Sequence, residues 1–100
     1  MQENQNYKPF QVGRLVATSG VVELVSEERL LECLKLHMQG QWGCLCEEDW
    51  KLNDLATHNG ERLLSCYPID PSQPCEGSNR LWLITEWDRS LSTFLLPEEY

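Results

Sequence analysis

The sequence has no long apolar run and few basic residues. No apolar stretch approaches the about 18 residues of a membrane-spanning helix, so we expect no transmembrane segment and no membrane partner. Residues 1–6 are polar and lack the basic-then-apolar order of a secretion signal, which predicts a cytoplasmic protein. Only 8 Lys and Arg residues oppose 16 Asp and Glu residues, for a net charge of −8. This balance argues against direct nucleic-acid binding, which needs a positive surface.

The sequence also lacks the short motifs that mark common active and metal sites. It has no phosphate-binding loop, nucleophile elbow, HExxH zinc motif or EF-hand loop. Its five cysteines are an odd number, which does not suit a disulfide framework. An alternative is a zinc site built from His37, Cys44, Cys46 and Cys66. Because the spacing matches no common zinc signature, we expect no metal and no cofactor, and we place Cys75 in a loop as an exposed thiol.

The chain is predicted to form one small α+β domain. A length of 100 residues with 41% hydrophobic residues supports a single core. Residues 1–8 are polar and aperiodic and predict a flexible arm, which leaves one domain over residues 9–100. Hydrophobic periodicity and turn residues predict a strand at 9–18, helices at 27–38 and 47–59, and strands at 62–67, 80–86 and 90–96. Short connections make the last three strands an antiparallel meander, so we expect a two-layer fold.

Both helices have predicted ends and predicted apolar faces. Ser26 is expected to cap the first helix, and Gly60 to end the second in the left-handed conformation. The expected buried residues of the first helix are Leu30, Leu34, His37 and Met38. Those of the second helix are Leu52, Leu55 and Ala56.

Most of the net charge lies in the helical part of the chain. Residues 26–61 hold eight acidic and three basic side chains, and so account for −5 of the −8. Acidic residues begin both helices, where a carboxylate is stabilised by the positive end of the helix dipole. The charge indicates either a solvated helical face or an electrostatic surface for a basic partner.

Several segments resemble one bacterial family. They are YKPFQVGRLVAT at 7–18, His37 with GQWG at 40–43, Glu47 to Asp49 with Asn53, RLLSCY at 62–67, WLITEWDRS at 82–90 with Thr93, and LLPEEY at 95–100. Together they resemble the small bacterial proteins labelled "plasmid-related protein", some of which are labelled type I restriction–modification subunits. The resemblance covers nearly the whole chain, and it implies a stand-alone domain encoded on mobile elements with no established activity. The family commonly has an aspartate where Gln41 stands.

We expect the protein to act by binding another protein rather than as an enzyme. The candidate contact residues are Glu47, Glu48 and Asp49 in the helical part and Trp87, Asp88 and Arg89 in a turn. The carboxylates would occupy the place of phosphates on a basic, nucleic-acid-processing partner and so inhibit or modulate it. A further alternative is a homodimer formed through a sheet edge, with Trp82 or Trp87 in the interface.

A ribonuclease is the alternative function. Two helices followed by a meander resemble the layout of barnase- and RelE-like ribonucleases, which need no metal. In this hypothesis His37 is the base, Arg62 and Arg89 hold the scissile phosphate, and Tyr67 or Thr85 positions the substrate. The acidic charge and the apolar helix face that carries His37 both disfavour it.

Overall fold

The protein is described from a computed structural model, which covers residues 4–100. The elements in chain order are β1 (Arg14–Ala17), α1 (Ser19–Leu24), α2 (Glu27–Met38), α3 (Glu47–Asn59), β2 (Leu63–Tyr67), β3 (Leu81–Thr85), β4 (Leu91–Leu95) and the 3₁₀ helix η1 (Pro97–Glu99). The predicted α+β class is confirmed, as are the two main helices and the antiparallel β2–β3–β4 meander.

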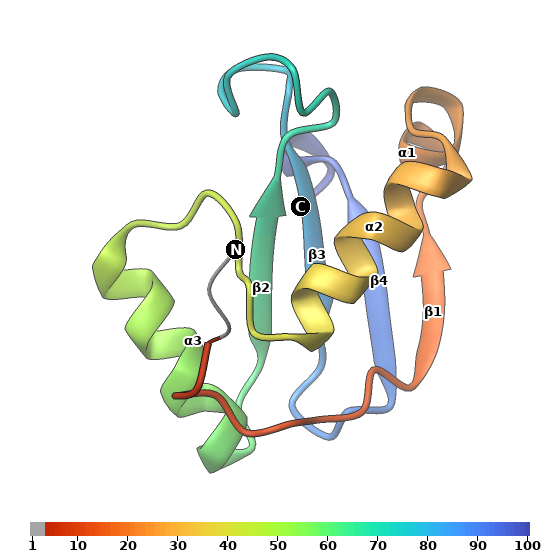
Figure 1. The fold of residues 1–100 in the computed structure, drawn as a ribbon. Helices are drawn as coiled ribbons and strands as arrows, with labels where there is room; N and C mark the ends of the chain where they lie inside the picture. Colours follow the sequence, from red (N-terminus) through yellow and green to blue (C-terminus); the bar gives the residue numbers. More distant parts are fainter. Residues whose placement is uncertain (1–3) are drawn as a thin grey trace.

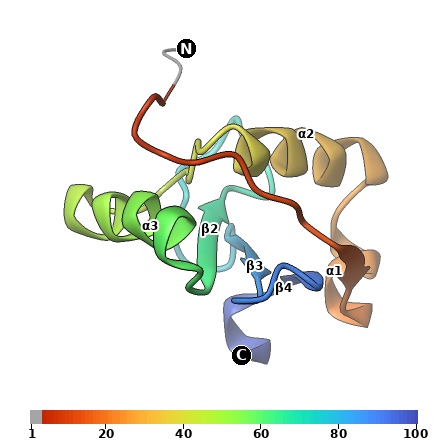
Figure 2. The same ribbon diagram turned by 90° about the horizontal axis from the view of Figure 1, so that it is seen from below.

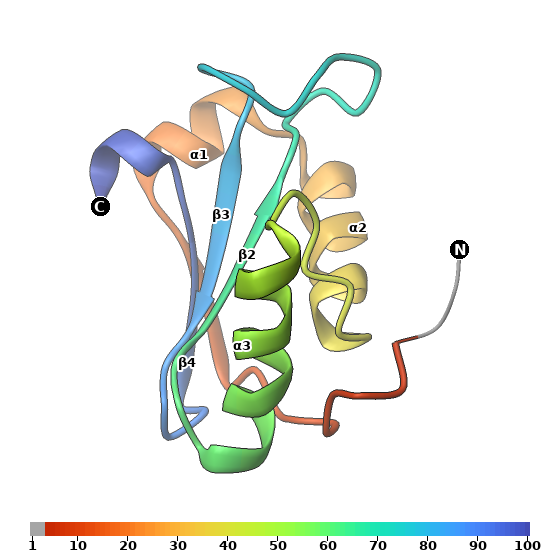
Figure 3. The ribbon, with the colours of Figure 1, turned by 90° about the vertical axis from the view of Figure 1, so that its left-hand side faces the viewer.

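The four strands form one sheet in the order β1-β4-β3-β2. Helices α2 and α3 lie on one face of the sheet, and the C-terminal segment with η1 lies on the other (Figures 2 and 3). Figure 1 shows β1 at one edge and β2, beside α3, at the other. Trp82 lies on β3, an interior strand, so the structure corrects its predicted place at an edge interface.

The first strand is shorter than predicted and pairs with β4 in the parallel direction. Residues 9–13 are not part of it, because the chain turns at Gly13, whose φ is +64°. A Cβ at Gly13 would lie 2.4 Å from the carbonyl oxygen of Arg89, so this close approach admits only glycine. Before this turn the chain runs past the ends of the strands, on the side of the helices, and after it the chain enters β1 (Figures 1 and 2).

Local side chains explain the helix ends. The hydroxyl of Thr18 accepts the Val21 N–H and begins α1. The hydroxyl of Ser26 accepts the Arg29 N–H at 3.2 Å, as predicted for the start of α2. Gly60 ends α3 with a φ of +68°, also as predicted.

Two clusters of buried residues make up the core. The larger one joins α1, α2 and the sheet: Val21, Val25, Cys33, Tyr67, Leu81, Leu83, Phe94 and Leu96. The smaller one lies under α3: Trp42, Ala56 and Leu63. The predicted burial of Met38 is wrong, since 42% of its surface is exposed at the end of α2.

Helix α3 packs through a face that includes only one of the three residues predicted to be buried, Ala56. Leu52 and Leu55 were expected in the core, yet they are 58% and 56% exposed. The buried residues of α3 are Asn53, Asp54, Ala56 and Thr57. Polar groups draw this face inward, because the Asp54 carboxylate accepts the Trp42 indole N–H at 2.9 Å inside the core.

Residues 4–8 also differ from the prediction of a free arm, because they contact α3. The Asn4 amide donates a hydrogen bond to Asp54 at 2.7 Å. The backbone N–H of Lys8 donates to a threonine hydroxyl of α3 at 2.8 Å. The packed part of the chain therefore begins before Pro9, and residues 1–3 of the predicted arm lie outside the described residues.

Candidate functional site

A chain of four buried polar side chains crosses the interface between α2 and the sheet. His37 Nδ1 lies 2.5 Å from Ser65 Oγ, and His37 Nε2 lies 2.8 Å from Thr85 Oγ1. Thr85 Oγ1 lies 2.7 Å from Ser92 Oγ, which donates to the Val12 carbonyl oxygen at 2.7 Å. All four side chains are fully buried, so this hydrogen-bonded row of side chains has no contact with solvent.

The Val12 carbonyl fixes the direction of every hydrogen bond among these four side chains. Ser92 uses its single hydroxyl proton on Val12, so it accepts from Thr85. Thr85 then accepts the N–H of His37 Nε2, which leaves His37 Nδ1 to accept the Ser65 hydroxyl proton. The neutral imidazole therefore has both nitrogens satisfied and carries no free lone pair for a substrate.

Burial also holds His37 in its neutral form. Removal from solvent, with a smaller contribution from the Arg89 charge, lowers the pKa of His37 to about 3. The rings of Phe10 and Trp42 meet the imidazole edge-on, with centroids 5.3 and 5.4 Å away. A general base must reach its substrate, and this imidazole is covered on all sides.

The structure does not bring the predicted ribonuclease residues into one site. Arg62 lies on the sheet face opposite His37, where it binds the Tyr100 hydroxyl at 2.9 Å and Glu86 at 3.6 Å. Tyr67 is in the core, and its hydroxyl donates to a backbone carbonyl at 2.6 Å. Of the predicted set, only His37 and Thr85 share a hydrogen bond, and both are buried.

Arg89 ties the β3–β4 turn to the end of α3. Its guanidinium donates to the carbonyl oxygens of Ala56 at 3.0 Å, Glu61 at 2.5 Å and Glu86 at 3.1 Å. The guanidinium also lies over the Phe10 ring, 5.8 Å from its centroid. These contacts engage three of the five N–H groups of the Arg89 guanidinium in holding the turn to α3.

Two predicted contact residues of the β3–β4 turn differ in their surroundings: Trp87 is exposed, and Asp88 forms hydrogen bonds within the turn. Trp87 is 66% exposed. The Asp88 carboxylate accepts the Ser90 N–H at 3.1 Å and the Ser90 hydroxyl at 2.6 Å, and these hydrogen bonds lower the pKa of Asp88. Asp88 therefore stabilises the turn, as turn aspartates commonly do.

Three acidic side chains stand together at the start of α3. Glu47, Glu48 and Asp49 are all exposed, and Glu47 forms an exposed ion pair with Lys51 at 3.2 Å. Asp54 is the exception among the acids of this helix, since its carboxylate is buried beneath Trp42. The acids predicted as contact residues are thus available to a partner.

The two exposed leucines of α3 lie next to these acids. Leu52 follows Glu48 by four residues and precedes Leu55 by three, a spacing that places all three on one side of a helix. We call Glu47, Glu48, Asp49, Leu52 and Leu55 the α3 surface. The sequence contained a signal for the exposure of the two leucines. Asn53, Ala56 and Thr57 form a second stripe along the helix, of small and polar residues, which is an alternative buried face.

Three cysteines gather at the end of β2. Cys66 Sγ lies 3.9 Å from Cys75 Sγ, and Cys44 also interacts with Cys75. Burial raises the pKa of both Cys66 and Cys75. Among residues 4–100, no group of three or more His, Cys, Asp or Glu side chains is arranged to hold a metal ion, and both nitrogens of His37 are used elsewhere.

Comparisons with protein-family models, with curated proteins and with solved structures find no match to this chain. The family resemblance of the sequence therefore stays a prediction. None of the helices formed by residues 4–100 has the length and apolar character to cross a membrane.

Proposed function

We propose that the protein is a protein-interaction module that docks a basic partner on the α3 surface. The observation that carries the proposal is the exposure of Leu52 and Leu55, at 58% and 56%, directly beside the exposed acids at the start of α3. Exposed apolar side chains beside acidic ones are typical of a protein interface, and of these acids Glu47 pairs with Lys51. Burial of each leucine by a partner would contribute up to about 1.5–3 kcal/mol.

The partner is a protein with a nucleic-acid-binding cleft. Glu47, Glu48 and Asp49 present three carboxylates within one helical turn, and carboxylates pair with the arginines and lysines that normally contact phosphates. Binding of the α3 surface in such a cleft would inhibit or modulate the partner. The resemblance to proteins of mobile elements suits this role, since a mobile element benefits from restraining a nucleic-acid-processing factor of its host cytoplasm.

No described contact favours the ribonuclease. A metal-independent ribonuclease needs a base that reaches the 2′-hydroxyl and a cation that reaches the phosphate. The imidazole of His37 is fully buried, and Arg62 lies on the other face of the sheet.

The test compares two variants with the same net charge. The first reverses the α3 acids (Glu47→Lys, Glu48→Lys, Asp49→Lys). The control reverses three exposed acids that form none of the ion pairs among the described residues (Glu23→Lys, Glu76→Lys, Glu98→Lys). Affinity capture from a bacterial host, quantified by mass spectrometry, should recover a basic nucleic-acid-binding protein with the wild type and the control, and lose it with the first variant. Equal recovery with both variants would contradict the proposal.

A further inference from the structure

The two edge strands of the sheet differ in whether their outward backbone groups are hydrogen-bonded. At the β2 edge, the Asn53 side chain donates to the Leu64 carbonyl at 2.5 Å and accepts the Leu64 N–H at 3.2 Å. One pair further along, the Cys66 N–H donates to Trp42, and the Cys66 carbonyl accepts the Cys44 N–H at 2.7 Å. The outward backbone groups of β2 are therefore already satisfied, and this edge takes no further strand.

The β1 edge remains open. Arg14 and Thr18 direct their N–H groups to β4, at 3.0 and 3.1 Å. Since backbone groups alternate in direction along a strand, the N–H and C=O of Leu15 and Ala17 point away from the sheet. No strand formed by residues 4–100 pairs with β1 on that side. An extended segment is the shape of ligand that such an edge binds.

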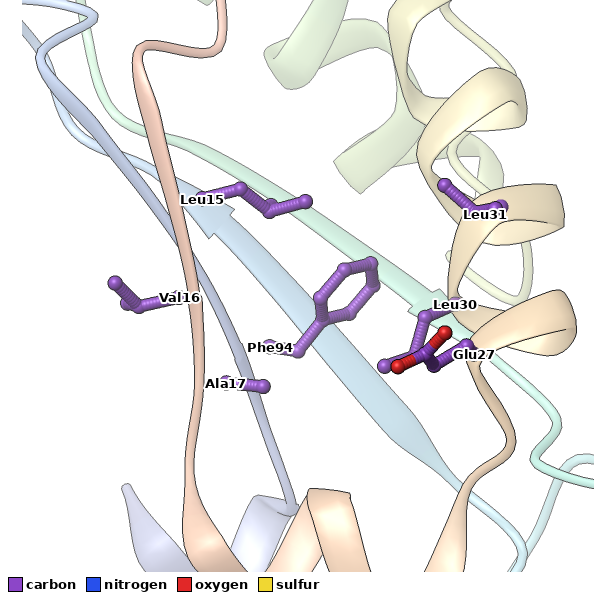
Figure 4. Close-up of a pocket in the computed structure, with 7 residues that line it drawn as sticks. All are labelled: Leu15, Val16, Ala17, Glu27, Leu30, Leu31 and Phe94. Atoms are coloured by element: carbon purple, nitrogen blue, oxygen red, sulfur yellow. The ribbon is translucent and has the colours of Figure 1, made fainter.

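A groove of about 240 Å³ lies between this edge and α2. Its lining is apolar apart from one carboxylate: Leu15, Val16, Ala17, Glu27, Leu30, Leu31 and Phe94. Figure 4 shows Leu15 and Phe94 directed toward Leu30 and Leu31 across the groove, and the Glu27 carboxylate beside Leu30 on the α2 side. Leu15 and Leu31 are 41% and 55% exposed, so the groove opens to solvent along β1.

The charge around the groove selects the kind of segment. Glu27 is exposed and takes part in none of the ion pairs among the described residues. A second copy of the chain would bring its own charge of −8 to this edge, whereas a basic segment would meet an uncompensated carboxylate. Side chains two positions apart on an extended segment face the same side, so one can enter the groove while the other reaches Glu27.

We propose that β1 binds an extended segment of a partner protein by strand addition, with an apolar side chain in the groove and a lysine or arginine two positions away paired with Glu27. The segment extends the sheet beyond β1, and its backbone pairs with Leu15 and Ala17. This surface is distinct from the α3 surface, so the proposal goes beyond the function proposed above and does not depend on it.

The experiment selects a random-peptide display library on the wild-type protein. The enriched peptides should share an apolar residue and a lysine or arginine two positions apart. On the Glu27→Lys variant the same selection should enrich an acidic residue at the second position, because the charge that selects it is reversed. Enrichment of unrelated peptides, or of none, would overturn the proposal.

Variants of the strand and the groove then locate the binding. Ala17→Pro removes an outward N–H that β4 does not use, and Leu31→Glu places a charge in the groove. Each should weaken an enriched peptide at least about tenfold, while the matched control Leu24→Glu, at a leucine outside the groove, should change its affinity less than about twofold. Circular dichroism confirms that each variant is folded. An unchanged affinity for both Ala17→Pro and Leu31→Glu would overturn the proposal.

Two further measurements separate this proposal from its competitors. The variant with the α3 acids reversed should bind the enriched peptides as the wild type does, so failure of one surface does not imply failure of the other. A wild-type dimer in solution that Ala17→Pro converts to a monomer would show that a second copy occupies the edge, and would overturn the proposal.

Discussion

The carbonyl of Val12 decides the chemistry of the one buried histidine. It accepts a hydrogen bond from the Ser92 hydroxyl, and this fixes the direction of the hydrogen bonds that lead from Ser92 through Thr85 to His37. The imidazole is neutral, satisfied and sealed beneath Phe10 and Trp42. Its role is to join α2 to the sheet through hydrogen bonds that an apolar side chain could not make.

The low pKa of His37 predicts a loss of stability on mild acidification. The pKa is about 3 in the folded protein and about 6.5 in the unfolded chain, so the unfolded chain binds the proton first. The free energy of unfolding should therefore fall as the pH drops below about 6.5, by about 2 kcal/mol between pH 7 and pH 5. Urea unfolding at the two pH values measures it.

The control for this prediction is His37→Gln, which has no titratable group at position 37. Its unfolding free energy should be lower at pH 7 but should lose most of the dependence between pH 7 and pH 5. An equal pH dependence in both proteins would show that other groups cause the loss. The carboxylates with lowered pKa, Asp70, Asp88 and Glu99, titrate below this window and do not interfere.

The sequence predicts part of this residue-scale chemistry. The helical period places His37 on the buried face of α2, and it is buried. Whether its polar neighbours form an open site or a sealed network is decided by Phe10 and Trp42. Phe10 is distant from His37 in sequence, and Trp42 lies beyond the end of α2, so the period of the helix reports neither contact.

At the scale of elements, α3 differs most from its prediction. A leucine stripe and a small polar stripe run along the same helix, and periodicity favours the leucines. The polar stripe faces inward because its side chains have partners there: Asn53 closes the β2 edge, and Asp54 binds Trp42. A buried indole N–H needs an acceptor, and Asp54 on the inward face of α3 supplies it.

This orientation predicts opposite effects for substitutions on the two faces of α3. Leu52→Ser with Leu55→Ser should change the free energy of unfolding by less than about 0.5 kcal/mol, as is usual for surface positions. Asp54→Ala should lower it by about 2–3 kcal/mol, because the Trp42 indole and the Asn4 amide both lose their acceptor. Chemical denaturation measures both. A large loss for the leucines with none for Asp54 would contradict the observed packing.

Strand pairing was predictable only where it is local. The β3–β4 pairing follows from the short turn between these strands, and β2 pairs with β3 across the loop at residues 68–80. The parallel pairing of β1 with β4 joins residues 14–17 to residues 91–94, and no turn between them signals it. The open β1 edge could therefore be found only from the structure.

At the scale of the whole molecule, the net charge of −8 is distributed between structural and exposed carboxylates. Asp54 forms a hydrogen bond with Trp42 in the core, and Asp88 forms one with Ser90 in a turn. Glu47, Glu48 and Asp49 are exposed beside two leucines. The composition predicts an acidic protein, but only the packing separates the carboxylates that maintain the fold from those that a partner can reach.

The binding affinity of the captured partner tests the interaction module most directly. Titration calorimetry would compare the wild type with the two charge-matched variants, the α3 acids reversed and the control acids reversed. Reversal of Glu47, Glu48 and Asp49 should weaken binding at least about tenfold, which corresponds to about 1.4 kcal/mol, while the control should change it less than about twofold. Equal affinities of the two variants would contradict the assignment of the α3 surface as the docking site.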